Sequence, residues 1–182
     1  MIVRFVLVFA VTLICGCKKT NVNSLVKGNP GEVKVLMFTS TDCPIANALV
    51  PEFKRLQEEV DREGGTMTFV HTWEHRTQSE LDVHAKDFDF TPHNIIDKEH
   101  ELVRSFKATV TPEIVVLRFD ASSVPKVIYQ GKINNLFDSP GNRRDRATEH
   151  YARDAIRAAA QGKAVTPSYR KPTGCLIEMS HD

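Results

Sequence analysis

The feature that most constrains the fold of this chain is an apolar run that passes into a helical pattern, with a cysteine at the junction. Residues 33–38 are mostly apolar, which predicts a buried strand. A short polar turn leads to Cys43, and Pro44 suits the first position of a helix. Apolar residues then recur at helical spacing at Ala46, Leu49, Val50, Phe53, Leu56 and Val60. A strand that feeds a helix predicts an α/β layer structure, in which the helix dipole favours a thiolate on Cys43.

The rest of the chain continues the alternation of strands and helices. The patterns predict strands over residues 66–73, 114–117 and 126–129, a short extended piece over 94–96, and helices over 77–88, 98–106 and 147–161. We expect Asp97 to cap the second of these helices and Gly162 to close the third. The early strands alternate with helices and should be parallel, whereas the last two should form a hairpin. Residues 163–182 contain prolines and are expected to be irregular.

The N-terminus has the pattern of an export signal. Residues 5–14 form an apolar stretch that is short for a membrane span, and residues 13–17 resemble the cleavage site of a bacterial lipoprotein. Cleavage before Cys17 would leave a lipid on its thiol and hold the protein at a membrane of the cell envelope, facing the periplasm. A plain secretory signal or a short membrane anchor is the alternative. The predicted organisation is a signal peptide over 1–16, a tether over 17–31, a domain over 32–162, and a tail over 163–182 that carries Cys175.

Charge and cysteine count narrow the classes of partner. The chain has 24 basic and 23 acidic residues, so no basic excess indicates a nucleic-acid partner. Its four cysteines are too few for a disulfide scaffold at this length. Processing would discard Cys15 and acylate Cys17. Cys43 and Cys175 would then be the two remaining thiols, in a compartment where disulfides persist.

The element order, with a cysteine at the first strand–helix junction, resembles the thioredoxin fold. Pro51 lies where thioredoxins carry a kinking proline in the first helix. Thr111-Pro112 directly precedes the third core strand, where that fold keeps a cis-proline beside the active-site sulfur. The extra helical segment before Thr111 resembles the longer redoxin and TlpA-like branch. The resemblance implies a central mixed sheet flanked by helices, with an inserted helical segment before the cis-proline strand.

A closer resemblance is to exported redoxin proteins that carry a Ser/Thr-x-Asp-Cys-Pro-Ile-Ala-Asn signature, which residues 40–47 match. Residues 110–113, Val-Thr-Pro-Glu, and residues 174–177, Gly-Cys-Leu-Ile, match two further segments of those proteins. The resemblance covers residues 32–178. It implies a thiol redox activity toward either a protein thiol or disulfide partner or a small peroxide.

Departures from the known patterns bear on the reaction. A thioredoxin dithiol needs Cys-x-x-Cys so that the second thiol resolves a mixed disulfide, but Ala46 stands at that position. Asp42 replaces the tryptophan that usually precedes the cysteine, and its charge opposes thiolate formation. In the peroxiredoxin pattern, Ser40 fits the residue three before the cysteine, whereas Leu36 replaces a proline and no arginine has a clear counterpart. We therefore do not expect a standard peroxiredoxin.

The leading interpretation makes Cys43 a redox nucleophile and Cys175 the thiol that resolves it. A cysteine in a flexible tail can reach back to the active site, and the missing local partner motivates the pairing. A static structural disulfide, an intermolecular disulfide, and an inactive cysteine in a partner-binding domain are the alternatives.

The other candidate site residues are Asp42, Pro44, Asn47, Thr111, Pro112 and Glu113. By resemblance, Pro112 would shape the substrate groove. Asn47 could orient the cysteine loop or be an ordinary polar residue of the first helical turn. Glu113 follows the expected cis-proline and could either tune Cys43 or point to solvent.

Histidines offer a metal-binding alternative. Sco-like copper chaperones use a thioredoxin fold with two cysteines near the first helix and a distant histidine. The soft donors available here for copper are Cys43, Cys175, His71, His75 and His84. His71 and His75 lie at a strand end and could be solvated, and His84 lies beside apolar residues, where a satisfied semi-buried histidine is commoner. The redox interpretation itself needs no cofactor.

Overall fold

The structure, a computed structural model, describes residues 25–73 and 75–179. The predicted signal peptide over 1–16, Cys17 and the first part of the tether lie outside these residues. Within the described ranges, no helix is both long enough and apolar enough to cross a bilayer.

A six-stranded mixed sheet forms the centre of the molecule. The elements are β1 Val33–Thr39, α2 Pro44–Arg62, β2 Thr66–His71, α3 Gln78–Asp87, β3 Asn94–Ile96, α4 Glu101–Phe106, β4 Val110–Thr111, β5 Glu113–Phe119, β6 Pro125–Gly131, β7 Phe137–Ser139, β8 Asn142–Arg143, α5 Tyr151–Ala160, β9 Tyr169–Arg170 and β10 Cys175–Leu176. The strand order in the sheet is β3-β2-β1-β5-β6-β9. β1, β2 and β3 run parallel, whereas β5 is antiparallel to β1 and to β6. The predicted parallel strands and late hairpin are therefore confirmed.

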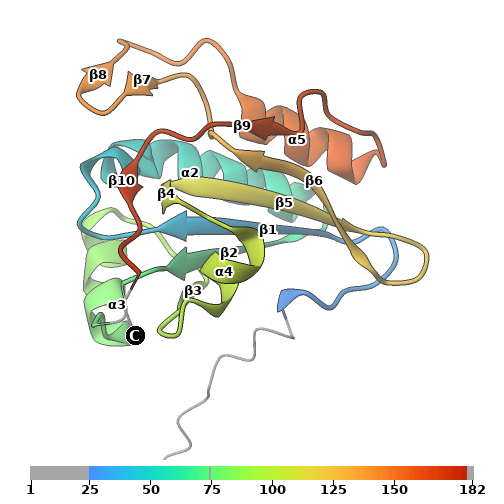
Figure 1. Cartoon of the computed structure of the whole chain (residues 1–182), viewed down its shortest axis with the longest axis horizontal. Helices are drawn as coiled ribbons and strands as arrows, with labels where there is room; N and C mark the ends of the chain where they lie inside the picture. Colours follow the sequence, from blue (N-terminus) through green and yellow to red (C-terminus); the bar gives the residue numbers. More distant parts are fainter. Residues whose placement is uncertain (1–24, 74, 180–182) are drawn as a thin grey trace, which may run out of the picture.

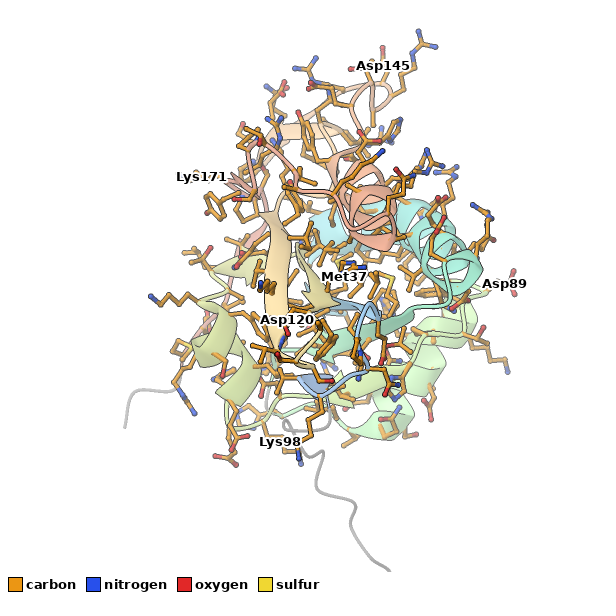
Figure 2. All side chains as sticks on the ribbon, turned by 90° about the vertical axis from the view of Figure 1, so that its right-hand side faces the viewer. Met37, Asp89, Lys98, Asp120, Asp145 and Lys171 are labelled. Atoms are coloured by element: carbon orange, nitrogen blue, oxygen red, sulfur yellow. The ribbon has the colours of Figure 1, made fainter. Side chains whose placement is uncertain are left out.

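β1 is buried on both faces, which explains its apolar sequence. Val35 and Met37 belong to the core shared with α2 and α5, whereas Leu36 and Phe38 belong to the opposite core with α4. Figure 1 shows helices on the two sides of the sheet, and Figure 2 shows Met37 in the interior with Asp89 at the rim. A central mixed sheet flanked by helices in this order is a thioredoxin-like fold, as the sequence predicted.

The inserted segment before the cis-proline strand is also confirmed, and it contains α3, β3 and α4. The N-cap residue of the last of these helices is His100 and not Asp97, although the Asp97 carboxylate accepts hydrogen bonds from the amides of Leu102 and Val103 at 3.3 and 2.9 Å. The helix begins at Glu101 rather than at residue 98. The helix begins later because residues 97–100 form a turn, in which the amide of His100 donates a hydrogen bond to the carbonyl oxygen of Asp97.

The C-terminal third departs most from the sequence-based predictions. α5 begins at Tyr151 rather than at residue 147, because Asn135 accepts hydrogen bonds from the amides of Thr148 and Glu149 and holds them outside the helix. A short β7–β8 hairpin was not predicted. The expectation of an irregular tail over 163–182 is wrong in two places, since β9 pairs with β6 and β10 pairs with β4.

Candidate functional site

Cys43 caps the N-terminus of α2 just after β1 ends. The amide of Ala46 donates a hydrogen bond to its sulfur at 3.5 Å, and its thiol donates to the carbonyl oxygen of Thr111 at 2.9 Å. Only 2% of Cys43 is exposed. The sulfur therefore has a donor for its anionic form and an acceptor for its protonated form, but almost no contact with solvent.

The second thiol of the site comes from the C-terminal segment. Cys175 Sγ lies 2.8 Å from Cys43 Sγ, and both cysteines are free. A disulfide joins sulfurs about 2.05 Å apart, so a movement of about 0.8 Å would bring the pair to bonding distance. Burial, together with the contact with Cys43, raises the pKa of Cys175 to about 11. Reduced Cys175 is therefore protonated at neutral pH.

A short strand holds Cys175 at this position. β10 pairs with β4 in antiparallel register, with Cys175 opposite Thr111. The amide of Ile177 donates to the carbonyl oxygen of Thr109 at 3.1 Å and extends the pairing. In Figure 1 the red C-terminal segment passes β4 near the N-terminus of α2. The tail is thus docked on the domain and forms part of the site.

Gly174 is required where the tail approaches the cis-proline loop, and we expect Gly174→Ala to move Cys175 away from Cys43. A Cβ atom at this position would lie 2.1 Å from the carbonyl oxygen of Thr111, the same atom that accepts the Cys43 thiol. Loss of one or two strand hydrogen bonds costs about 1–2 kcal/mol, so oxidation of the thiol pair by oxidised glutathione should slow about tenfold. Stopped-flow alkylation and mass spectrometry would measure the rate.

Val127→Ala is the control for this substitution. Val127 lies in β6, is 48% exposed and is not among the residues around the two sulfurs, so truncating its side chain should leave the oxidation rate unchanged. A Gly174→Ala protein that is oxidised as fast as the wild type would show that β10 does not set the distance between the sulfurs.

The loop before Cys43 is tied to the start of the inserted segment. The Asp42 carboxylate forms an ion pair with Arg76, whose guanidinium lies 4.9 Å from the centre of the Trp73 ring. The pairing raises the pKa of Arg76. It also places a positive charge beside the acidic group that was expected to oppose a thiolate. Pro44 begins α2 and is exposed.

Two of the candidate histidines contact asparagines on neighbouring elements. His84 Nε2 lies 3.0 Å from Asn47 Oδ1, and Asn47 Nδ2 donates to the carbonyl oxygen of Thr41 at 2.9 Å. His71 Nε2 lies 3.0 Å from Asn94 Oδ1. Asn47 thus connects the cysteine loop to α3, which agrees with a role in orienting that loop.

Glu113 is buried, so the solvent-facing alternative for this residue is wrong. Its carboxylate accepts hydrogen bonds from the amide of Thr109 at 2.9 Å and from Gln130 Nε2 at 2.8 Å. Thr109 is also the residue whose carbonyl oxygen binds Ile177. Glu113 therefore anchors the loop on which the strand of Cys175 rests.

A hollow of about 480 Å³ opens beside the two sulfurs. Its lining includes three exposed apolar side chains, those of Trp73, Leu176 and Met179. The peptide bond before Pro112 is cis, as expected, but Pro112 lines a separate small hollow and Thr111 lines the larger one. The larger hollow has the volume and the mixed lining that are typical of ligand sites.

The candidate copper ligands are divided between two hollows. Within residues 25–73 and 75–179, no group of three or more His, Cys, Asp or Glu side chains is placed to hold a metal ion. His75 lines the same hollow as the two cysteines, whereas His71 and His84 line a different one. Cys43, Cys175 and His75 are therefore the candidate donors that share one hollow.

Two residues of the site were missed by the sequence analysis. His100 is buried at the edge of the larger hollow, with Nε2 2.6 Å from the carbonyl oxygen of Thr72. Arg76 pairs with Asp42 across 34 positions of the chain. No local pattern marks either residue, because each is defined by a partner distant in sequence.

No protein-family model and no curated protein matches the chain. Among solved structures, a hypothetical protein from Sinorhizobium meliloti is similar with a TM-score of 0.68 and 18% identity, covering 84% of this chain and 82% of that one. An uncharacterized conserved protein from Geobacillus kaustophilus has a TM-score of 0.64 and 20% identity, over 88% and 82%. A secreted disulfide oxidoreductase from Mycobacterium tuberculosis has a TM-score of 0.45 and 15% identity, over 77% and 85%. The first two likenesses bear on the fold alone. Fold and site together describe a thioredoxin-like domain with two thiols in contact.

Proposed function

We propose that this protein is an exported thiol–disulfide oxidoreductase of the redoxin type, with Cys43 and Cys175 as its redox pair. The observation that carries the proposal is the 2.8 Å contact between the two sulfurs, made by residues 132 positions apart in the chain. The position of Cys43 at the N-terminus of α2 supports it, since a helix N-terminus stabilises the nucleophilic thiolate.

In the proposed reaction the Cys43 thiolate attacks a disulfide of a partner protein. A mixed disulfide forms on Cys43, and the first thiolate of the partner leaves and takes a proton. Cys175 loses its proton and attacks the Cys43 sulfur, which forms the Cys43–Cys175 disulfide and frees the second thiol of the partner. The partner gains two electrons and the protein loses two. Because Cys43 is 2% exposed, β10 has to move aside for the first step.

A small peroxide is the other oxidant that suits this thiol pair. Attack by Cys43 would give a sulfenic acid and an alcohol or water, and condensation with Cys175 would give the same disulfide and one water molecule. The proposed lipid on Cys17 would keep either reaction at a membrane surface facing the periplasm. The N-terminal sequence supports that part of the proposal. Cys17 itself lies outside the described residues.

The test is whether the two thiols can be oxidised to a disulfide and then reduced again. Oxidised and then reduced glutathione should remove and restore two hydrogen atoms in the intact mass, with the disulfide mapped to Cys43 and Cys175. Cys43→Ser should abolish reduction of insulin disulfides, because the attacking sulfur is lost. Cys175→Ser should accumulate a mixed disulfide on Cys43 instead of releasing product.

Ser122→Ala is a suitable control, because Ser122 is exposed in the β5–β6 turn at the opposite end of the sheet (Figure 1). It should leave turnover unchanged. Two thiols that survive oxidant, or stoichiometric retention of Cu(I) that is lost in Cys43→Ser, would contradict the redox proposal and favour a binding or metal-carrying domain.

A further inference from the structure

The geometry assigns different roles to the two sulfurs of the oxidised pair: we propose that the thiol donor that regenerates the dithiol attacks Cys175 and not Cys43. The mixed disulfide with the donor would then form on β10. This inference rests on the proposed Cys43–Cys175 cycle. It extends the cycle to the second half-reaction, in which a thiol donor reduces the Cys43–Cys175 disulfide.

Access separates the two sulfurs. Cys43 belongs to the core packed around α2, is 2% exposed, and has its sulfur between the amide of Ala46 and the carbonyl group of Thr111. Cys175 is partly exposed, on a two-residue strand whose next side chain, Leu176, is 81% exposed. A thiolate has to reach the sulfur that it attacks, from the side opposite the sulfur that leaves. Cys43 is almost fully enclosed, whereas Cys175 is partly exposed, so a donor thiolate reaches Cys175 more readily.

The comparison of the two sulfurs as leaving groups also favours attack on Cys175. Attack on Cys175 expels Cys43 as a thiolate at the N-terminus of α2, where the amide of Ala46 already donates to the sulfur. Attack on Cys43 would instead expel Cys175, and burial raises the pKa of that thiol. A thiol that binds its proton so tightly leaves slowly.

Regeneration of the Cys43 and Cys175 thiols consumes two thiols of the donor. The first donor thiolate attacks Cys175 Sγ, so that a donor–Cys175 disulfide forms, the Cys43–Cys175 bond breaks, and the electron pair stays on Cys43. A second donor thiolate attacks the donor's own sulfur in that mixed disulfide. The donor leaves as a disulfide, and Cys175 leaves as a thiolate that takes a proton. The donor loses two electrons and the protein gains two.

Oxidised protein and glutathione provide the test. The full chain, with C15S and C17S to remove the other thiols, is oxidised to the Cys43–Cys175 disulfide, which intact mass verifies. It is mixed with excess glutathione, quenched with acid within the first turnover, and alkylated with N-ethylmaleimide. Peptide mapping should place glutathione on Cys175 and the alkyl group on Cys43, with a preference of about tenfold or more.

The same disulfide unfolded in guanidinium chloride is the control. Both sulfurs are then exposed, so the preference should fall to about threefold or less, which shows that the folded structure sets the site of attack. Glutathione on Cys43 in the folded protein, or no preference there, would overturn this inference while leaving the proposed cycle standing. Failure of the disulfide to form before glutathione is added would overturn both.

Discussion

Reduction of the Cys43–Cys175 disulfide is expected to lower the free energy of unfolding by about 4 kcal/mol. The bond would link residues 132 positions apart and would therefore restrict the unfolded chain over most of the domain. The folded protein already holds the two sulfurs in contact, so forming the bond needs little rearrangement of the native state. Urea unfolding of the oxidised and the reduced protein would measure the difference between the two midpoints and slopes.

Cys175→Ser is the control for this stability difference. The variant keeps the fold of β10 and removes the cross-link, so its free energy of unfolding should be the same with and without reductant. It should also lie close to that of the reduced wild type. Equal stability of the oxidised and reduced wild type would mean that the disulfide distorts the folded state by as much as it restricts the unfolded one.

The layer structure could be predicted because its elements are long and carry a complete pattern. β1 is apolar on both faces and lies in the centre of the sheet, and α2 repeats its apolar residues over about four turns. Patterns of this kind depend on near neighbours in the chain. The cis peptide bond before Pro112 was expected on another ground, the resemblance to the thioredoxin fold, and the structure confirms it.

The assembly of the site could not be predicted to the same extent. β9 and β10 have two residues each, which is too short for any periodic pattern, and their position follows from pairing with distant strands. Whether Cys175 meets Cys43 depends on that pairing and on Gly174, so the sequence left the distance open. The ion pair between Arg76 and Asp42 could not be predicted either, because it also joins residues that are distant in the chain. Contacts between distant residues decide the chemistry, and the sequence marks only the residue types.

His71 is expected to make the protein lose stability in acid. Its Nε2 lies 3.0 Å from Asn94 Oδ1, and its Nδ1 is buried without a hydrogen-bond partner among the described residues. Burial, opposed by the contact with Asn94 and helped by the charge of His84, lowers the pKa of His71 from 6.5 to about 4. Between these two values the unfolded chain binds a proton that the folded protein does not. Stability is therefore lost as the pH falls through this window, by about 3 kcal/mol in total, and His71 adds nothing further below it.

His71→Gln isolates this contribution, because glutamine still offers an amide to Asn94 and does not titrate. Urea unfolding between about pH 7 and about pH 4 should show the wild type losing about 3 kcal/mol more than the variant. Carboxylate protonation affects both proteins alike and cancels in the difference. Parallel stability curves would show that His71 binds its proton equally well in the folded and unfolded states. If the variant does not fold, an NMR titration of His71 in the wild type decides the matter, since a midpoint near 6.5 contradicts the prediction and one near 4 supports it.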